Sequence, residues 1–480
     1  MTALGLAPLL GLGGLWVAMD RRVQRGEWKI GAPAASTSAI APKGPILSLR
    51  RAPTALAGDV NDRQLTTALG PVTSVTGDAS CFAASLDGHT VVADGADLPV
   101  LPASNQKIIT AAVALEVLGP EFTFVTRAHG ALNGDAVDGD LVLVGGGDPL
   151  LVSSGGQFPD GFVLDERYPT FEAPTHLETL ADAVAAQVRH VSGRIVADDS
   201  HFDGERYGAG WPAGVRGETA GPLSAAFVND SRRLDAPKQW VDDPSLYTAS
   251  EFTRLLRARG VVIDAEPAVG ALPAGLPELA EVASAPLTVV VKEMLLNSDN
   301  NTAEMVLKEI GAKALGGQGS TAAGLAAVMD KLAEWGVPLA GVSLTDGSGL
   351  DRANLLTCRA VLAVLDHVGS SGPMYDALPT PGGPLGTLRD PGTDADLGGN
   401  LTAFEDLQVD QRVHAKTGTL SDVKALSGWF DLADGRKVAF SLIVNGAGAK
   451  TQARQLWRVM AQSLAAFSGV PSSELAIAGT

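Results

Sequence analysis

Three short polar motifs, separated by long stretches of chain, constrain the fold of this 480-residue sequence more than any other feature. They are Ser104-x-x-Lys107, Ser298-Asp299-Asn300 and Lys416-Thr417-Gly418. The first opens a run with apolar residues at helical spacing, the second lies in a turn between two helical runs, and the third lies on an alternating segment typical of a strand. If the motifs belong together, the fold must bring three distant segments to one place.

Taken singly, each motif is weak evidence. Ser421-x-x-Lys424 also fits the first pattern, as chance matches do in any long chain. Ser104 could be only a helix N-cap, Asn300 could cap the helix that follows it, and Lys416 could be a solvated lysine on a strand. In this order and in these settings the three motifs are far more specific, because the combination is typical of enzymes with a serine nucleophile.

The residue types suit covalent catalysis by a serine whose base is an amine. Residues three apart on a helix share a face, so the Lys107 amine can reach the Ser104 hydroxyl. The amine must be neutral to act as a base, so its pKa has to fall from about 10.4 toward working pH. Burial would lower this pKa, and so would a nearby cation, for which Lys416 is the candidate. A helix-start amide, and an exposed edge strand that pairs with an extended peptide, would supply two oxyanion donors.

The composition excludes some partners. Hydrophobic residues make up 45% and charged residues 19% of the chain, which is a globular composition. The formal net charge of −18 argues against a nucleic-acid partner and gains nothing from an anionic membrane surface.

The cysteines and histidines limit metal chemistry. The chain has 2 cysteines and 7 scattered histidines without the spacing of a zinc peptidase, so we expect no metal site. Cys81 and Cys358 could pair in an oxidising compartment or remain separate buried thiols, and the sequence leaves both open.

The N-terminus predicts an export signal or a membrane anchor over residues 1–22. Residues 3–19 are uncharged and mostly apolar, at the short end of what spans a bilayer. No basic residue precedes them, whereas Arg21, Arg22 and Arg25 follow, so we expect the true start to lie upstream. A buried helix is the alternative. Residues 23–59 are rich in Ala and Pro and predict a linker, with ordered structure from near residue 60.

The remaining chain alternates between two kinds of pattern. Residues 80–94 predict a hairpin around Asp87-Gly88, and residues 412–447 predict three antiparallel strands. Helical patterns cover residues 105–118, 286–315, 319–336 and 451–467. Between them, residues 123–285 read as mixed α and β with many loops. The acidic pair Asp198-Asp199 within this block is interpreted as a turn feature.

Several of these stretches resemble those of the class C, low-molecular-mass penicillin-binding proteins of the D-alanyl-D-alanine carboxypeptidase/endopeptidase family. The resemblance covers nearly everything after residue 60. The similar stretches are PASNQKIITAAVALEVLGPEFTFVT, LVLVGGGDPLL, SGRIVADDSHF, SDNNTAEM, DGSGLDRANLLT, LPTPGGPLGTLRD and HAKTGTLSDVKALSGWF.

The resemblance implies an α/β (α+β) fold. A serine β-lactamase/DD-peptidase-like domain, with a central antiparallel sheet flanked by helices, would comprise residues 60–122 and 286–475. The block at 123–285 would be an insertion of two nested small domains, which the shorter β-lactamases do not have.

It also implies roles for the motif residues. Ser104 would attack the carbonyl of the terminal D-alanyl peptide bond, and Lys107 would take its proton. Ser298 would relay a proton to the leaving amine, and Asn300 would hold the substrate amide. Lys416 would support the proton network.

The remaining implications concern the substrate and its location. Thr417, Gly418 and Thr419 would bind the substrate, with Thr417 and Thr419 holding its carboxylate. The backbone amides of Ser104 and Thr419 would form the oxyanion hole. The expected partners are peptidoglycan stem peptides, with β-lactams as inhibitors, on the cell-wall side of the membrane, and without any metal or organic cofactor. The alternatives are a non-catalytic peptidoglycan-binding or scaffolding protein with this fold, and a β-lactamase.

Overall fold

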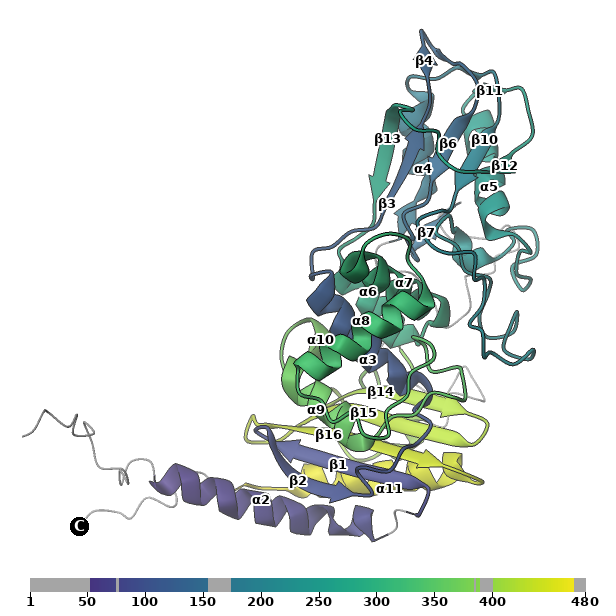
Figure 1. Ribbon diagram of the computed structural model, residues 1–480. Helices are drawn as coiled ribbons and strands as arrows, with labels where there is room; N and C mark the ends of the chain where they lie inside the picture. Colours follow the sequence, from purple (N-terminus) through teal and green to yellow (C-terminus); the bar gives the residue numbers. More distant parts are fainter. Residues whose placement is uncertain (1–51, 75–76, 154–173, 384–385, 389–399, 470–480) are drawn as a thin grey trace, which may run out of the picture. The chain divides into compact units, whose positions relative to one another are not determined.

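The computed structural model describes residues 52–74, 77–153, 174–383, 386–388 and 400–469 (Figure 1). The predicted signal or anchor at 1–22 and most of the predicted linker at 23–59 lie outside these ranges. Residues 57–471 form one compact unit, to which the following description applies. Among the described helices, none combines the length and the apolar character needed to cross a bilayer.

The first sheet joins strands from opposite ends of the described chain. Figure 1 shows the early strands β1 and β2 beside the late strands β14, β15 and β16. The order is β14-β15-β16-β1-β2, and all neighbours are antiparallel. The bounds are β1 Ser80–Leu86, β2 His89–Asp94, β14 Val413–Leu420, β15 Val423–Asp431 and β16 Lys437–Asn445. The predicted hairpin is confirmed, since Asp87 and Gly88 have φ of 53° and 78°, as a two-residue turn requires.

Helices pack on both faces of this sheet, in agreement with the predicted fold class. The alternation along β1 shows why, since Cys81 and Ala83 enter one apolar core while Phe82 and Ala84 enter another. The helices are α2 Ala52–Thr73, α3 Gln106–Val117, α6 Leu287–Asn297, α7 Asn300–Leu315, α8 Thr321–Glu334, α9 Cys358–Val368, α10 Pro373–Asp376 and α11 Ala449–Ala466. Helix α2 begins at Ala52, earlier than the ordered structure expected from near residue 60.

A disulfide resolves the question that the sequence left open. Cys81 on β1 is bonded to Cys358, the first residue of α9, with 5.8 Å between the two Cα atoms. The bond links segments 277 positions apart in sequence and lies within the core on the α3 side of the sheet.

Residues 125–283 carry sheets and an apolar core of their own. A five-stranded sheet has the order β12-β10-β6-β3-β13, a four-stranded sheet has the order β11-β9-β5-β4, and β7 pairs with β8. The strands are β3 Val125–His129, β4 Leu132–Asn133, β5 Ala136–Val137, β6 Leu141–Val144, β7 Leu151–Val152, β8 Thr175–His176, β9 His190–Val191, β10 Ile195–Asp198, β11 Val262–Ile263, β12 Ala268–Val269 and β13 Glu278–Ala283, and the helices are α4 Leu177–Ala185 and α5 Pro244–Ala258. The mixed α and β content is confirmed, whereas the division into two nested domains stays a prediction.

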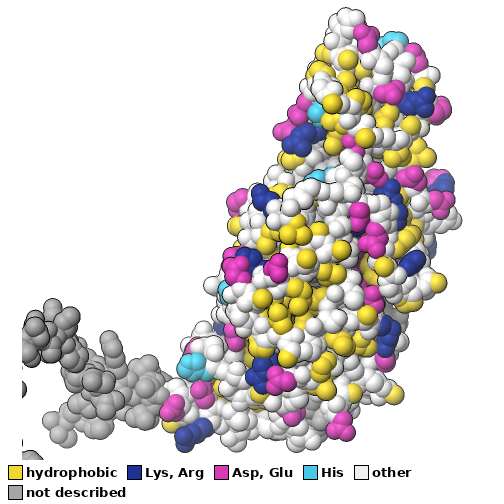
Figure 2. Space-filling model, viewed as in Figure 1, with side chains coloured by type: hydrophobic (Ala, Val, Ile, Leu, Met, Phe, Trp, Pro, Cys, Tyr) yellow, Lys and Arg dark blue, Asp and Glu magenta, His cyan; other side chains and the backbone are white. Residues whose placement is uncertain are grey.

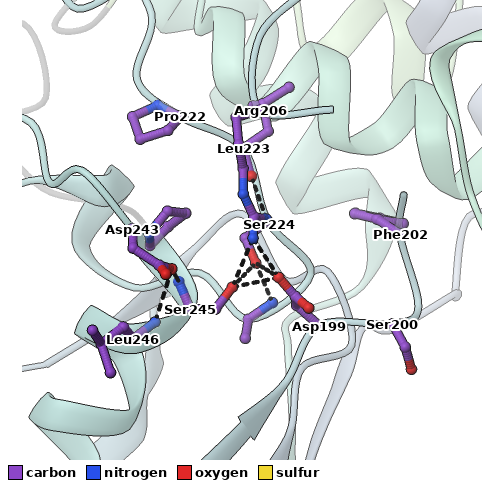
Figure 3. A network of polar contacts seen from close by, with 12 residues as sticks. Asp199, Ser200, Phe202, Arg206, Pro222, Leu223, Ser224, Asp243, Ser245 and Leu246 are labelled. Carbon is purple, nitrogen blue, oxygen red and sulfur yellow. Dashed lines mark hydrogen bonds and ion pairs between the residues drawn. The ribbon is translucent and has the colours of Figure 1, made fainter. Parts of the chain in front are cut away.

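The acidic pair Asp198-Asp199, at the end of β10, has a structural role, as predicted. Asp199 accepts hydrogen bonds from Arg206 at 2.6 Å and from Ser245 at 2.5 Å, and Ser245 lies 2.7 Å from Ser224 (Figure 3). Asp198 accepts from two backbone amides. The pair therefore ties the start of α5 to the loops around it.

Charged side chains are mixed on the surface. On the face of the described chain seen in Figure 2, basic and acidic groups alternate without a continuous basic area. A surface of this kind, on a chain with a net charge of −18, favours solubility.

Candidate active site

The nucleophile candidate lies on a tight turn. Ser104 is in the short 3₁₀ helix η1 (Ala103–Asn105), which leads directly into α3. Ala103 has φ of 48°, a conformation that residues with a Cβ seldom adopt. No side chain caps η1 or α3, so the alternative that Ser104 is only an N-cap is wrong.

Two glycines let other segments approach this turn. A Cβ at Gly418, on β14, would lie 2.8 Å from the Pro102 carbonyl oxygen and 3.3 Å from the Ala103 Cβ. A Cβ at Gly349, where φ is +85°, would lie 1.9 Å from the Ala103 carbonyl oxygen. The third motif therefore needs its glycine because the strand packs directly against the turn that carries Ser104.

Lys107 joins the first motif to the second. Its side chain is fully buried, and its Nζ lies 3.1 Å from Ser104 Oγ, 2.8 Å from Asn300 Oδ1 and 2.9 Å from the Ser348 carbonyl oxygen. The structure thus brings together residues that are 193 and 241 positions apart in sequence.

These three partners match the bonding capacity of a neutral amine. A neutral lysine has two N–H donors and one lone pair. Asn300 Oδ1 and the Ser348 carbonyl can only accept, so they take both N–H groups. The charged amine donates to Ser104 Oγ as well, but once it loses a proton its lone pair is left for the Ser104 hydroxyl, which is the arrangement that a general base requires.

Burial lowers the pKa of Lys107 from 10.5 to about 8. The carboxylates of Asp299, Asp346 and Glu304 act in the opposite direction. A pKa in this range leaves a useful neutral fraction near neutral pH.

The Lys107 and Lys416 amines interact electrostatically, and the influence of Lys416 on the pKa of Lys107 stays a prediction. Burial, followed by repulsion from Lys107 and Lys424, lowers the pKa of Lys416 itself well below its usual value. The alternative of a solvated Lys416 is wrong, because the side chain is fully buried and donates to the Thr417 carbonyl at 2.9 Å.

In the second motif, Asn300 points toward the site. Asp299 caps α7 by accepting from the Thr302 amide at 2.6 Å, so the alternative of Asn300 as the helix cap is wrong. Asn300 Nδ2 donates to the Thr219 carbonyl oxygen at 2.9 Å, which turns Oδ1 toward Lys107. Ser298 ends α6 in the left-handed region, with φ of 59°, and within the described chain its hydroxyl makes no hydrogen bond.

Strand β14 lies at the edge of its sheet, as predicted, but its centre is buried where exposure was expected. Residues after α10 cover it, since the Ala415 amide donates to the Pro379 carbonyl at 3.0 Å and the Thr417 hydroxyl donates to Thr387 at 2.7 Å. Amide directions alternate along a strand, so the Thr417 and Thr419 amides point away from β15, as the Ala415 amide does. The Thr419 hydroxyl accepts from Lys424 at 2.8 Å.

The motifs alone did not indicate three further contributors. Glu304 accepts hydrogen bonds from the amides of Gly347 and Ser348, and Thr219 orients Asn300 from within the inserted region. Trp211, also in that region, donates to Asp346 at 2.9 Å. The position of Glu304 four residues after Asn300 is a signal that could have pointed to it, because such residues share a helix face.

The fold and the site together have the features of a serine hydrolase. Residues 73–236 and 235–466 match the D-Ala-D-Ala carboxypeptidase 3 (S13) family. The chain is 30% identical over 427 residues to a D-alanyl-D-alanine carboxypeptidase of Actinomadura sp. (strain R39), covering 72% of this chain and 73% of that one. It is 31% identical over 364 residues to carboxypeptidase DacB of Mycolicibacterium smegmatis, with coverage of 74% and 73%.

A solved structure shares the fold. The crystal structure of penicillin-binding protein 4 (dacB) from Haemophilus influenzae superimposes with a TM-score of 0.66 and 21% identity, covering 82% of this chain and 98% of that one. The chain belongs to the D-Ala-D-Ala carboxypeptidase 3 (S13) family, and so to the low-molecular-mass penicillin-binding proteins. The family that the motifs suggested is confirmed.

Proposed function

We propose that this chain is a serine-type D-Ala-D-Ala carboxypeptidase that acts on peptidoglycan stem peptides through an acyl-enzyme on Ser104. Cleavage of D-Ala cross-links, an endopeptidase activity, is part of the proposal. The observation that carries it is the environment of Lys107, whose Nζ lies within hydrogen-bonding distance of Ser104 Oγ, Asn300 Oδ1 and the Ser348 carbonyl oxygen.

In the acylation step, Ser104 Oγ attacks the carbonyl carbon of the terminal D-Ala-D-Ala bond while its proton passes to Lys107 Nζ. The amides of Ser104 and Thr419 stabilise the oxyanion. When the C–N bond breaks, Lys107 returns a proton through Ser298 to the leaving amine. The products of this step are an ester on Ser104 and free D-alanine.

In the deacylation step, water attacks the ester, Lys107 accepts a proton from the water, and the Ser104 oxygen leaves and regains a proton. The second N–H of Asn300 Nδ2 is available to hold a substrate carbonyl, since its first is used by Thr219. Lys416, Thr417 and Gly418 place the strand that aligns the peptide, and Thr417 and Thr419 hold its terminal carboxylate.

The proposed setting is extracytoplasmic, with residues 1–22 as export signal or anchor. A disulfide between Cys81 and Cys358 supports an oxidising compartment, where such bonds persist. The proposed domain division is a catalytic domain of residues 60–122 and 286–475 that is interrupted by residues 123–285.

β-Lactams are the proposed inhibitors, because their strained amide is open to the same serine attack. A structure of the Haemophilus influenzae relative is described as a complex with a novel β-lactam.

Labelling by a fluorescent penicillin tests the proposal. We expect Ser104→Ala to abolish labelling while circular dichroism shows that the fold is retained. Ser421→Ala is the matched control, because Ser421 also lies three residues before a lysine, and it should label as the wild type does. Retained labelling of Ser104→Ala would remove Ser104 from its role, and rapid turnover of the penicillin would favour a β-lactamase.

A further inference from the structure

Glu304 is a buried carboxylate beside the site that the proposed steps do not use. It lies on α7 one turn after Asn300 and is 1% exposed. Its carboxylate accepts from the Ser348 amide at 2.8 Å and from the Gly347 amide at 3.0 and 3.1 Å. Because its two oxygens hold two successive backbone amides, Glu304 clamps the loop of residues 346–349.

This loop packs against α3, the helix that follows Ser104. Three successive carbonyl oxygens accept from α3, and the first two do so from Gln106 at 3.2 Å and Thr110 at 2.7 Å. The third, the Ser348 carbonyl, accepts from Lys107 at 2.9 Å. The position of the loop therefore decides where Lys107 finds its second acceptor.

The packing around the loop leaves little freedom. A Cβ at Gly347 would lie 2.8 Å from the Ala303 carbonyl oxygen, so the backbone rests directly on α7. Asp346 accepts from the Gly349 amide at 2.7 Å, and this amide belongs to the same peptide group as the Ser348 carbonyl. Asp346 and Lys107 thus bind opposite sides of one peptide group and fix its orientation.

We propose that Glu304 is a positioning residue for acylation. By holding the Gly347 and Ser348 amides, it keeps the Ser348 carbonyl on Lys107 and so reserves the lysine lone pair for Ser104. If the clamp is lost, an N–H of Lys107 is free to turn toward the Ser104 oxygen, which weakens the base. This inference rests on the proposed roles of Ser104 and Lys107.

Charged groups surround Lys107 and Glu304, so the positioning role of Glu304 can be tested from the pH dependence of the labelling rate. Asp299 and Asp346 face Lys107 together with Glu304, and Lys416 faces it from β14. Burial and then Asp346 raise the pKa of Glu304 to about 8. Each carboxylate stabilises the charged form of Lys107, so removing one lowers the pKa of the amine.

The test compares Glu304→Gln with Glu309→Gln in the full chain. Glu309 is a buried glutamate on the same helix, and it binds His201 of the inserted region. The second-order rate constant of labelling by a fluorescent penicillin is measured from pH 6 to 10, together with the fraction of protein labelled at saturation.

We expect Glu304→Gln to label completely but roughly ten to a hundred times more slowly. The pH range over which the labelling rate of Glu304→Gln rises should move to lower pH. The labelling rate of Glu309→Gln should stay within about twofold of the wild type, and the pH range over which it rises should be unchanged.

Equal labelling rates and equal pH ranges for the two variants would overturn the inference while leaving the proposed function intact. A smaller labelled fraction with a normal rate would overturn it too, because that pattern belongs to a purely structural role. If Glu304→Gln does not fold, Glu304→Asp withdraws the carboxylate by one methylene and should label slowly, with an unchanged pH range. An unlabelled wild type would contradict the proposed function itself.

Discussion

Two buried lysines in different places in the molecule have different hydrogen-bond partners, carboxylates around one and uncharged groups around the other. Lys107 in the candidate active site is 0% exposed, and Lys308, where α7 meets the inserted region, is 1% exposed. Lys308 forms an ion pair with Asp203 and lies 3.9 Å from Glu205, so carboxylates compensate its charge. The three atoms that bind Lys107 belong to a hydroxyl, a side-chain amide and a peptide carbonyl.

The different surroundings of Lys107 and Lys308 suit two different roles for a buried lysine. A buried ammonium persists where a carboxylate lies against it, whereas burial among neutral acceptors favours loss of the proton. The lysine on α7 therefore attaches this helix to the inserted region, whereas the lysine in the candidate active site is the proposed base.

The largest effect is expected from removing the base. Lys107→Met should slow acylation by at least about a thousandfold, because the Lys107 amine lies 3.1 Å from Ser104 Oγ and is the proposed acceptor of its proton. The rate of penicillin labelling measures this. Lys308→Met is the control, and its folded fraction should label at close to the wild-type rate. Equal losses of labelling rate in the two variants would contradict the different roles of Lys107 and Lys308.

The next effect concerns packing at the active site. Gly418→Ala should slow acylation by roughly ten to a hundred times, because the new methyl meets the Pro102 carbonyl oxygen at 2.8 Å and moves β14 away from the nucleophile turn. Gly204→Ala in the inserted region is the control, since its Cβ would meet nothing within 4 Å. Unchanged labelling of Gly418→Ala would show that this close approach is not needed.

Lys308→Met should lower stability instead of activity. The free energy of unfolding should fall by about 2 kcal/mol, because the substitution leaves the carboxylate of Asp203 without its partner. The 28% exposure of the Asp203 side chain keeps the loss from being larger. Urea denaturation measures the change, and an unchanged midpoint would mean that the ion pair adds nothing to folding.

The pH dependence of acylation should follow the neutral form of Lys107. With a pKa of about 8, the rate should rise about tenfold between pH 7 and pH 9, since the lysine loses its proton over this range. The pH profile of penicillin labelling checks this. A rate that is flat or falling over the same interval would exclude Lys107 as the titrating base.

The smallest effect is a pH-dependent contact between α7 and the inserted region. The hydrogen bond to Glu309 raises the pKa of His201, so the stabilisation is fully present below the unfolded pKa of about 6.5 and is lost as pH rises through the folded value. His201→Gln should cost about 0.5 kcal/mol at pH 6 and less at pH 9, a small value because the side chain is 36% exposed. A cost that grows with pH would contradict this sign.

Much of the fold was predictable because it follows from local sequence patterns. The Asp87-Gly88 hairpin, the strands between 412 and 447, and the main helices follow from periodicity and turn residues. The order of the motifs, with the resemblance, predicted that Ser104, Lys107 and Asn300 meet, and the structure brings these three into hydrogen-bonding distance.

Other features depend on contacts across the chain that no local pattern reports. The burial of β14 comes from Pro379, Thr387 and the nucleophile turn, which are distant in sequence. The disulfide joins cysteines 277 positions apart. Thr219 acts through its backbone carbonyl, so its side chain gave no signal.

The most direct measurement of the central claim is peptide mapping by mass spectrometry after treatment with penicillin. An amine-activated serine predicts a single covalent adduct on the peptide that contains Ser104, and no adduct in the Lys107→Met variant on the same time scale. An adduct on another residue, or equal modification of both proteins, would contradict the claim that Lys107 activates Ser104.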